Sequence, residues 1–399
     1  MMSHRFMLTG LAGLLIMWGC TRPHTPTDFT PLNLPGGPGS MYPSWAVLDD
    51  TLYLSWLDTS RDSLTSLRYA TCTDGQWSPA RDIASGSDWF VNWADFPAVL
   101  PLRSGRLAAH VLVRSGPNPY AYDAQVTVSS PDKSTWSPLF PLHQDTTGTE
   151  HGFVSLYEAD HDRVGAVWLD GRLYAADGPG PMTLRHALFD ASGQVTGDTV
   201  LDDRVCDCCQ TSVTLSQGRP VVSYRDRTAD DIRDISRVVI GETSLPAWTS
   251  DDGWKISGCP VNGAALASRE HQVAIAWFSG ANELPRVSVA FSADGGRTFG
   301  NPLLVSGTHP EGRTDIAWGD DGSVWVSWIE TTPAQSFVYI RNIRPDGQMG
   351  QPVAAGVISA ERNSGFPVLA CLKGRGYIAW TGADTLQQPQ VQGVTWSLY

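Results

Sequence analysis

The feature that most constrains this 399-residue chain is a short apolar strand pattern that recurs seven times at nearly constant spacing. The recurring segments begin at Thr51, Arg106, Arg163, Arg219, Gln272, Ser323 and Arg375. Successive starts are 55, 57, 56, 53, 51 and 52 residues apart, and the sixth position is Trp or Tyr in every segment except the one that has Val111. A fixed period near fifty residues predicts a fold built from repeated units that pack on their neighbours.

Each unit contains four short strand patterns separated by turn residues. The apolar segment follows a strand that often opens on a Pro-containing turn, such as DFPAVLPL from Asp95, and precedes an alternating strand such as RVSVAFS from Arg286. A fourth strand carries a Pro near its start, as in WSPARDI from Trp77. Four short strands per unit, with alternation and Gly or Asp turns, predict the blade of an all-β propeller.

The two ends of the chain complement each other. The last unit stops after its third strand, QGVTWSLY from Gln392, whereas FTPLNLP from Phe29 has the fourth-strand pattern. We therefore predict one propeller domain over residues 29–399, with seven blades closed by the N-terminal strand, because closure removes exposed sheet edges. A six-bladed ring with one additional hairpin is the alternative architecture.

The first residues have the pattern of an export signal. Arg5 precedes LTGLAGLLIMWG, an apolar run shorter than a comfortable membrane span. The run ends in Trp18, Gly19 and Cys20, which resembles the lipobox of bacterial lipoproteins, although Met17 and Trp18 depart from the usual Leu and small residue. An ordinary secretory peptide with a chance cysteine is the alternative.

The lipobox resemblance implies a signal peptide over residues 1–19, a lipidated Cys20 and a tether over residues 20–28. Lipid chains anchor a protein without spanning the bilayer. Thr21, which follows the cysteine, is not Asp and so favours sorting to the outer membrane. We expect an exported protein that is lipid-anchored to the bacterial cell envelope.

Charge and composition narrow the class of partner. The formal net charge is −13 and there is no basic run, which argues against nucleic acid and against an anionic membrane surface. We expect instead a glycan, protein or small-molecule ligand at one mouth of the propeller.

One segment points to a family. SADGGRTF, Ser292 to Phe299, matches the Asp-box pattern S-x-D-x-G-x-T-[FW], and the chain here resembles the sialidase-like (BNR/Asp-box) propellers. In that family the box is a turn between the third and fourth strands, on the face away from the active site. Asp294 is therefore expected to cap its own turn.

The unusual polar residues gather on loops that the topology brings together. If the first strand of each blade is innermost, the turns entering it and the loops leaving the Trp strand share one mouth of the channel, where loops commonly carry function. The entering turns carry Tyr42, Asp95, Glu150, His151, Cys206, Cys208, Cys209, Cys259, Arg313 and Arg362, and the leaving loops add Arg172 and Arg225.

The sialidase resemblance implies candidate roles at this mouth. A sialidase needs arginines that grip a carboxylate, a Tyr nucleophile beside a carboxylate, and an Asp acid/base. The candidate substrate-binding residues are Arg172, Arg225, Arg313 and Arg362. The candidate catalytic residues are Tyr42 or Tyr224 beside Glu150, and Asp95. The chain lacks an F/Y-R-I-P motif, and family sialidases have six blades, so an exo-α-sialidase-like glycoside hydrolase is the alternative function.

The cysteines depart most from a glycosidase. CDCCQT from Cys206 and GCPVNG around Cys259 resemble the signature of a bacterial sialidase-like lipoprotein group without a settled activity. Outside the cytoplasm a disulfide from Cys206, Cys208 or Cys209 to Cys259 is one hypothesis, with the partner open. The other is a soft metal ion, Cu(I) or Zn, held by these thiolates with His151 near. Our primary hypothesis is a binding or assembly module for a glycan, protein or metal partner.

Overall fold

The computed structural model describes residues 24–61, 64–160, 163–174, 180–242 and 246–399. The expected signal peptide, Cys20 and the start of the tether lie outside the described residues. No helix among the residues described is long and apolar enough to cross a bilayer.

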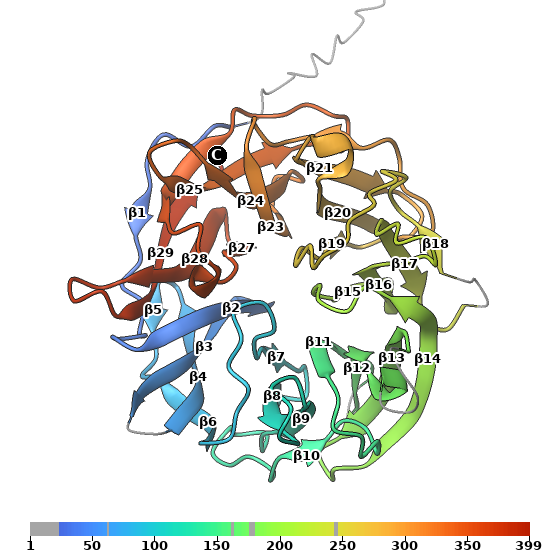
Figure 1. Cartoon of the computed structure of the whole chain (residues 1–399). Helices are drawn as coiled ribbons and strands as arrows, with labels where there is room; N and C mark the ends of the chain where they lie inside the picture. The colour runs from blue at the N-terminus through green and yellow to red at the C-terminus, as the bar shows by residue number, and fades with distance from the viewer. Residues whose placement is uncertain (1–23, 62–63, 161–162, 175–179, 243–245) are drawn as a thin grey trace, which may run out of the picture.

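Seven antiparallel sheets stand around a central axis (Figure 1), and each has its first strand innermost. The innermost strands are β2 (Ser40–Leu48), β7 (Val99–Pro101), β11 (His151–Glu158), β15 (Ser212–Ser216), β19 (Ala265–Arg269), β23 (Pro310–Trp318) and β27 (Val368–Leu372). The second strands are β3 (Thr51–Arg61), β8 (Leu107–Arg114), β12 (Arg163–Asp170), β16 (Arg219–Arg225), β20 (Gln272–Ser279), β24 (Val324–Thr331) and β28 (Arg375–Ala383). This arrangement confirms the predicted seven-bladed β-propeller.

The outermost strands differ in length from blade to blade, from two residues in β10 to eleven in β14. The third strands are β4 (Leu64–Thr73), β9 (Tyr122–Val128), β13 (Met182–Asp190), β17 (Ile235–Val239), β21 (Arg286–Ser292), β25 (Ser336–Ile343) and β29 (Pro389–Ser397). The outermost strands are β5 (Gln76–Trp77) and β6 (Arg81–Gly86), β10 (Phe140–Pro141), β14 (Val195–Val205), β18 (Ala247–Trp248), β22 (Leu303–Leu304), β26 (Val353–Ile358) and β1 (Thr30–Pro31). Short 3-10 turns are η1 (Arg172–Tyr174), η2 (Ala281–Glu283) and η3 (Arg362–Ser364).

The N-terminal strand closes the ring as predicted. β1 pairs antiparallel with β29, with Thr30 opposite Thr395 and Pro31 opposite Val394. The pairing continues one residue further, because Leu32 N donates to Gly393 O at 2.9 Å. The last blade therefore consists of β27, β28, β29 and β1, and the six-bladed alternative is wrong.

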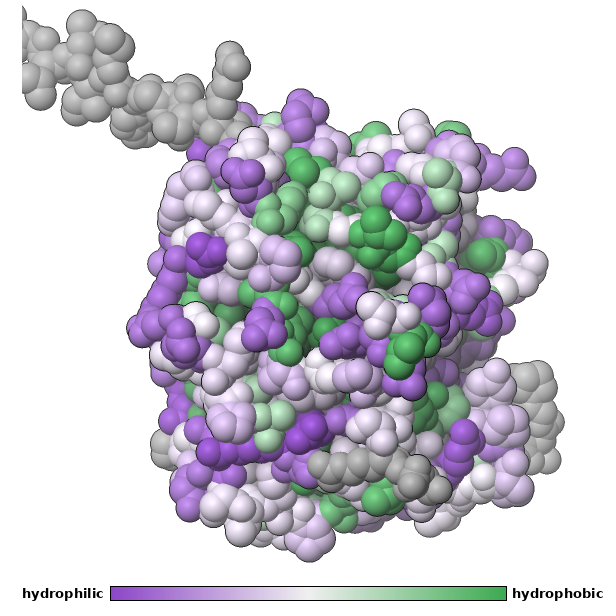
Figure 2. All heavy atoms as spheres, turned by 90° about the vertical axis from the view of Figure 1, so that its left-hand side faces the viewer, coloured by the Kyte–Doolittle hydropathy of each residue, from purple (hydrophilic) through white to green (hydrophobic). Residues whose placement is uncertain are grey.

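The recurring aromatic residues form the core between blades. Trp56, Trp168, Tyr224, Trp277 and Trp328 are fully buried. Trp168 of β12, for example, packs in one cluster with apolar residues of β8 and β9 in the preceding blade. Burying so large a side chain at each joint stabilises the ring through area removed from water. The outside wall beside β1 shows apolar side chains in small groups among polar ones (Figure 2).

Several innermost strands begin with the same backbone irregularity. Tyr42, Phe153 and Arg313 have positive φ angles of 52°, 54° and 52°. At each of them the pairing with the second strand shifts register. Such bulges bend the strand and re-aim side chains, and a non-glycine residue with positive φ persists only where its surroundings hold it. At the mouth, the innermost strands β2, β11 and β23 therefore each contain a β-bulge near their first residues.

The turn of SADGGRTF has the hydrogen bonds expected of its aspartate. Asp294 Oδ1 accepts from Ser292 Oγ at 2.7 Å and from the Thr298 backbone N–H at 2.9 Å. The Thr298 hydroxyl donates to Asp294 Oδ2 at 2.6 Å. This turn joins β21 to β22, at the end of the blade opposite the mouth.

Candidate functional site

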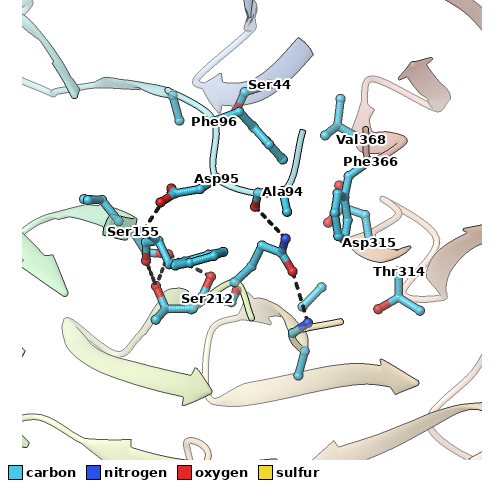
Figure 3. A pocket seen from close by; sticks show the side chains of 18 of the residues that line it. Ser44, Ala94, Asp95, Phe96, Ser155, Ser212, Thr314, Asp315, Phe366 and Val368 are labelled. Atoms are coloured by element: carbon cyan, nitrogen blue, oxygen red, sulfur yellow. Dashed lines mark hydrogen bonds between the residues drawn. The ribbon is translucent and has the colours of Figure 1, made fainter. Parts of the chain in front are cut away.

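A cavity of about 250 Å³ lies on the propeller axis (Figure 3). Every blade contributes to its wall; examples are Ser44, Asp95, Phe153, Gln210, Gly263, Thr314 and Phe366. Gln210 links three blades around this wall, because its amide donates to Ala94 O at 2.6 Å and accepts from Gly263 N at 3.1 Å. The axis is therefore a walled pocket with fixed polar groups.

Two carboxyl groups, that of the buried Asp95 and that of the partly buried Asp315, lie on opposite sides of this cavity (Figure 3). Asp95 Oδ1 accepts the Phe153 N–H of the next blade at 2.9 Å. Asp315 Oδ2 accepts the Leu369 N–H of its next blade at 2.6 Å. Burial raises the pKa of each carboxyl to about 7. Each aspartate therefore staples neighbouring blades and also retains a proton close to neutral pH.

Asp95 belongs to a network with Glu150 that is centred on Tyr122. The Tyr122 hydroxyl lies 2.9 Å from Asp95 Oδ2 and 2.7 Å from Glu150 Oε1. A phenol has one proton to donate, so the second contact needs a proton from one carboxyl group. Burial raises the pKa of Glu150 to about 8, and the Asp95 charge adds to the effect. The network thus holds a shared proton at neutral pH.

Tyr122 was missed by sequence reasoning, which named Tyr42 and Tyr224 instead. The Tyr224 hydroxyl donates to Asp202 Oδ2 at 2.6 Å, and Tyr42 packs on Phe96 with ring centroids 6.4 Å apart. Tyr122 lies at the start of the third strand β9 and stacks on Phe90, outside the two loop classes that the repeat pattern indicated. Sequence alone carried no signal for it.

Two of the four candidate arginines are bound to backbone. Arg225 is buried and donates to three carbonyl oxygens, those of Asn262 (2.8 Å), Arg233 (2.5 Å) and Phe278 (2.8 Å). Arg313 is also buried and donates to Ser364 Oγ (2.8 Å), Gly365 O (2.9 Å), Glu361 O (3.2 Å) and Ala360 O (3.0 Å). These guanidinium groups tie loops of adjacent blades together.

The other two arginines have different surroundings. Arg172 makes ion pairs with Asp170 at 2.7 Å and Asp198 at 3.3 Å. Arg362 is exposed, and its guanidinium lies 5.8 Å from the Trp93 ring centroid, with Arg313 at 4.8 Å from the same ring. Of the four, Arg313 and Arg362 are thus brought together by one tryptophan.

Four cysteines meet at the mouth. Cys206 Sγ lies 3.8 Å from Cys208 Sγ and 3.6 Å from Cys209 Sγ. Cys208 also belongs to a second close group with Cys259 and Asp207, whose possible ligand atoms lie within 4.8 Å of one another. All four are free thiols, and Cys259 is the exposed member. The entering loops of two successive blades therefore converge on one sulfur cluster, as the spacing predicted.

Positive and donor groups surround these sulfur atoms. Arg233 Nη1 donates to Cys206 Sγ at 3.3 Å, and the Asn262 N–H donates to Cys209 Sγ at 3.4 Å. Hydrogen bonds from Cys208 and Cys209, with the Arg233 charge, hold the pKa of Cys206 well below its usual range. Cys208 lowers the pKa of Cys259 to about 7. Hydrogen bonds with Cys206, Cys209 and Cys259 raise the pKa of Cys208, and burial raises the pKa of Cys209. Cys206 and Cys259 are therefore the members of the cluster that favour the thiolate, the form that binds metals.

His151 lies in a different group of possible ligands from the cysteines. Its ring stacks on His143 with centroids 4.0 Å apart, and both lie beside Asp123. Neither of the cysteine groups found in the described part of the chain includes His151. For Glu150, the residue before His151, the charges of Asp207 and Cys259 contribute to the raised pKa.

No protein-family model and no curated protein matches this sequence. Polysaccharide lyase Uly1 is similar in structure, with a TM-score of 0.54 and 8% identity over 89% of this chain and 90% of its own. A protein of unknown function from Dyadobacter fermentans has a TM-score of 0.52 at 13% identity, covering 94% of this chain and 99% of its own. An α-L-arabinanase from Penicillium chrysogenum, complexed with arabinobiose, has a TM-score of 0.51 at 13% identity, with the same coverages.

Sialidases, including NanB of Streptococcus pneumoniae, also match, with TM-scores of 0.46 to 0.48. Those scores are too low to bear on function. At identities of 8 to 13%, the three more similar structures establish the fold of this chain and not its activity. The chain has a β-propeller fold.

Proposed function

We propose that this protein is a metal-binding propeller, in which Cys206, Cys208, Cys209 and Cys259 hold a soft ion, Zn²⁺ or Cu(I), at the mouth. The observation that carries the proposal is the pair of Sγ–Sγ separations around Cys206, 3.6 and 3.8 Å. A tetrahedral ion with Zn–S bonds of about 2.3 Å separates its sulfur ligands by about 3.8 Å. A disulfide instead needs sulfur atoms about 2.0 Å apart.

Charge supports the same assignment. Four thiolates around Zn²⁺, or three around Cu(I), carry a net charge of −2. The guanidinium groups of Arg233 and Arg225 both lower the pKa of Cys206 through their charge, so two positive charges offset that complex. A single disulfide would leave two of the four thiols unpaired beside these cations. Metal binding uses all four cysteines with Zn²⁺ and three of them with Cu(I).

The proposal includes the setting of the protein. The lipobox-like segment ending at Cys20, and the resemblance of CDCCQT and GCPVNG to a sialidase-like lipoprotein group, support an exported, lipid-anchored protein of the outer membrane. The tether leads directly into β1 at the rim of the ring. Such a protein would offer its metal-bearing mouth to a glycan, protein or small-molecule partner.

The test is metal analysis of the full-length protein, purified without chelator under anaerobic conditions. We expect one equivalent of zinc or copper bound to thiolates, lost in Cys208→Ser and in Cys259→Ser. Cys72→Ser is the matched control, because Cys72 is a buried free thiol in β4 that belongs to neither cysteine group. Metal-free wild-type protein whose mass shows a Cys259 disulfide would refute the metal site and establish the covalent alternative.

A glycoside hydrolase is the second candidate, and the Asp95–Tyr122–Glu150 network favours it. Carboxyl groups with pKa values of about 7 and 8 retain the proton that a general acid needs at neutral pH. Two similar structures, the arabinanase and the polysaccharide lyase, are glycan-active by name. A panel of fluorogenic glycosides that includes a sialoside tests it: turnover abolished by Tyr122→Phe supports an enzyme, and no turnover of any member counts against one.

A further inference from the structure

Two histidines are stacked inside the joint between the second and third blades. The rings of His143 and His151 have centroids 4.0 Å apart and planes 26° apart, and both side chains are completely buried. His151 is the first residue of β11, and His143 lies in the loop that leads to it from β10. The sequence pattern singled out only His151, and for a different site.

None of the four ring nitrogens has a hydrogen-bond partner in the structure, nor does Oδ1 of Asp123. Leaving buried polar groups unpaired costs on the order of 1–3 kcal/mol each. His151 Nδ1 lies 3.1 Å and His143 Nε2 3.7 Å from that same Asp123 oxygen. The possible ligand atoms of these three residues therefore lie within 4.8 Å of one another, and the contact between His151 and Asp123 is at ion-pair distance.

The local charge is negative. His151 Nε2 lies 3.1 Å from Asp145 Oδ2 and 3.8 Å from Asp170 Oδ1. With Asp123, three carboxylates surround the histidine pair, and Arg172, which pairs with Asp170 at 2.7 Å, supplies one positive charge. Three negative charges against one positive leave −2 when both imidazoles are neutral, which is the charge that a divalent cation neutralises.

We propose that His143 Nε2, His151 Nδ1 and Asp123 Oδ1 form a second metal site, for a divalent ion of intermediate softness such as Zn²⁺. Ligand bonds of about 2.0–2.1 Å in tetrahedral geometry separate ligand atoms by about 3.3 Å, between the 3.1 and 3.7 Å found here. Because imidazole binds ions in its ring plane, at least one ring must rotate to direct its nitrogen at the shared ion.

Asp145 lies where its carboxylate could fix the orientation of the His151 ring. When Nδ1 of His151 binds an ion, its Nε2 carries the proton, and Asp145 Oδ2 lies 3.1 Å away to accept it. A carboxylate on the outer nitrogen of a ligating histidine fixes the ring and raises its basicity. The Asp145 oxygen is itself held, because the Thr147 N–H donates to it at 3.1 Å. This site shares no ligand with the cysteine cluster.

The experiment uses the full-length Cys208→Ser, Cys259→Ser protein, stripped of metal and titrated with Zn²⁺ alone. We expect one equivalent bound, lost in His143→Gln and in Asp123→Asn and weakened about 10- to 100-fold in Asp145→Asn. His186→Gln is the control, because His186 is a buried histidine that bonds Tyr157 at 2.8 Å outside this site. Failure of the cysteine site would leave these results unchanged.

Co²⁺ provides a second readout that needs no substitution in the histidine site. In the double-cysteine background, we expect d–d absorption bands of a nitrogen- and oxygen-ligated ion without thiolate charge-transfer bands. Folded background protein, verified by its thermal transition, that binds neither Zn²⁺ nor Co²⁺ would overturn the proposal. Equal Zn²⁺ affinity in the background protein and its His143→Gln variant would overturn it as well.

Discussion

Stability should fall as pH rises through neutrality, because of the protons held around Tyr122. The pKa of Asp95 is raised to about 7 and that of Glu150 to about 8, from unfolded values near 4. Between those limits the folded state holds protons that the unfolded chain has released. Stability from these groups is therefore fully present below about pH 4, declines above it, and is lost once the folded pKa is passed.

The magnitude follows from the number of protons. For each extra proton that the folded state holds, the free energy of unfolding falls by about 1.4 kcal/mol when the pH rises by one unit. Glu150→Gln removes one such proton and keeps an acceptor for the Tyr122 hydroxyl. Between pH 5 and pH 7 wild-type protein should lose about 3 kcal/mol more than this variant.

Chemical denaturation at half-unit pH intervals measures this difference directly. Glu158→Gln is the matched control, because it removes a carboxyl group that pairs with the exposed Arg103 and lies outside the Tyr122 network. Parallel curves for wild type and Glu150→Gln from pH 5 to 7 would show that the carboxyl groups do not share a proton. Aggregation during the titration is checked by light scattering.

Three further predictions concern scaffold and anchor. Arg225→Lys replaces a planar guanidinium group that reaches three carbonyl oxygens with a single ammonium nitrogen that cannot reach all three. We therefore expect a loss of roughly 3 kcal/mol in the free energy of unfolding, against less than about 0.5 kcal/mol for exposed Arg362→Lys; equal losses would contradict the assigned role. Deleting residues 29–35 should expose the edge of β29 and cause concentration-dependent aggregation, whereas deleting 24–28 should not. Cys20→Ala should abolish lipid labelling and release soluble periplasmic protein, and membrane retention after washing would contradict the lipobox interpretation.

The fold could be predicted from sequence because its signal is periodic. Trp56 and its equivalents recur where each blade must seal against its neighbour, and the Phe29 segment supplied the one missing strand. The meeting of Cys259 with the Cys206 run also follows from the period, since equivalent loops of adjacent blades are neighbours in space.

The finer contacts of the site were not predictable in this way. Tyr122 joins two predicted acids from a third strand, outside the loops that the repeat places at the mouth. His143 stacks on His151 from the start of the long loop entering β11, away from the turn that the pattern singled out. For Arg225 the repeat predicted the position of the residue at the mouth but not the contacts of its side chain. Those contacts are hydrogen bonds to three carbonyl oxygens of other segments.

The closing strand imposes an order on folding. Among the strands of the described residues, β1 is synthesised first and its partner β29 last, so this contact has the longest sequence separation of any strand pair described in the ring. The other blades pair locally and can form as the chain emerges, whereas closure waits for the final residues. A chain that ends before Pro389 would therefore leave β1 without a partner and β28 paired only with β27, so losing eleven residues would remove the strand that joins the two ends of the ring.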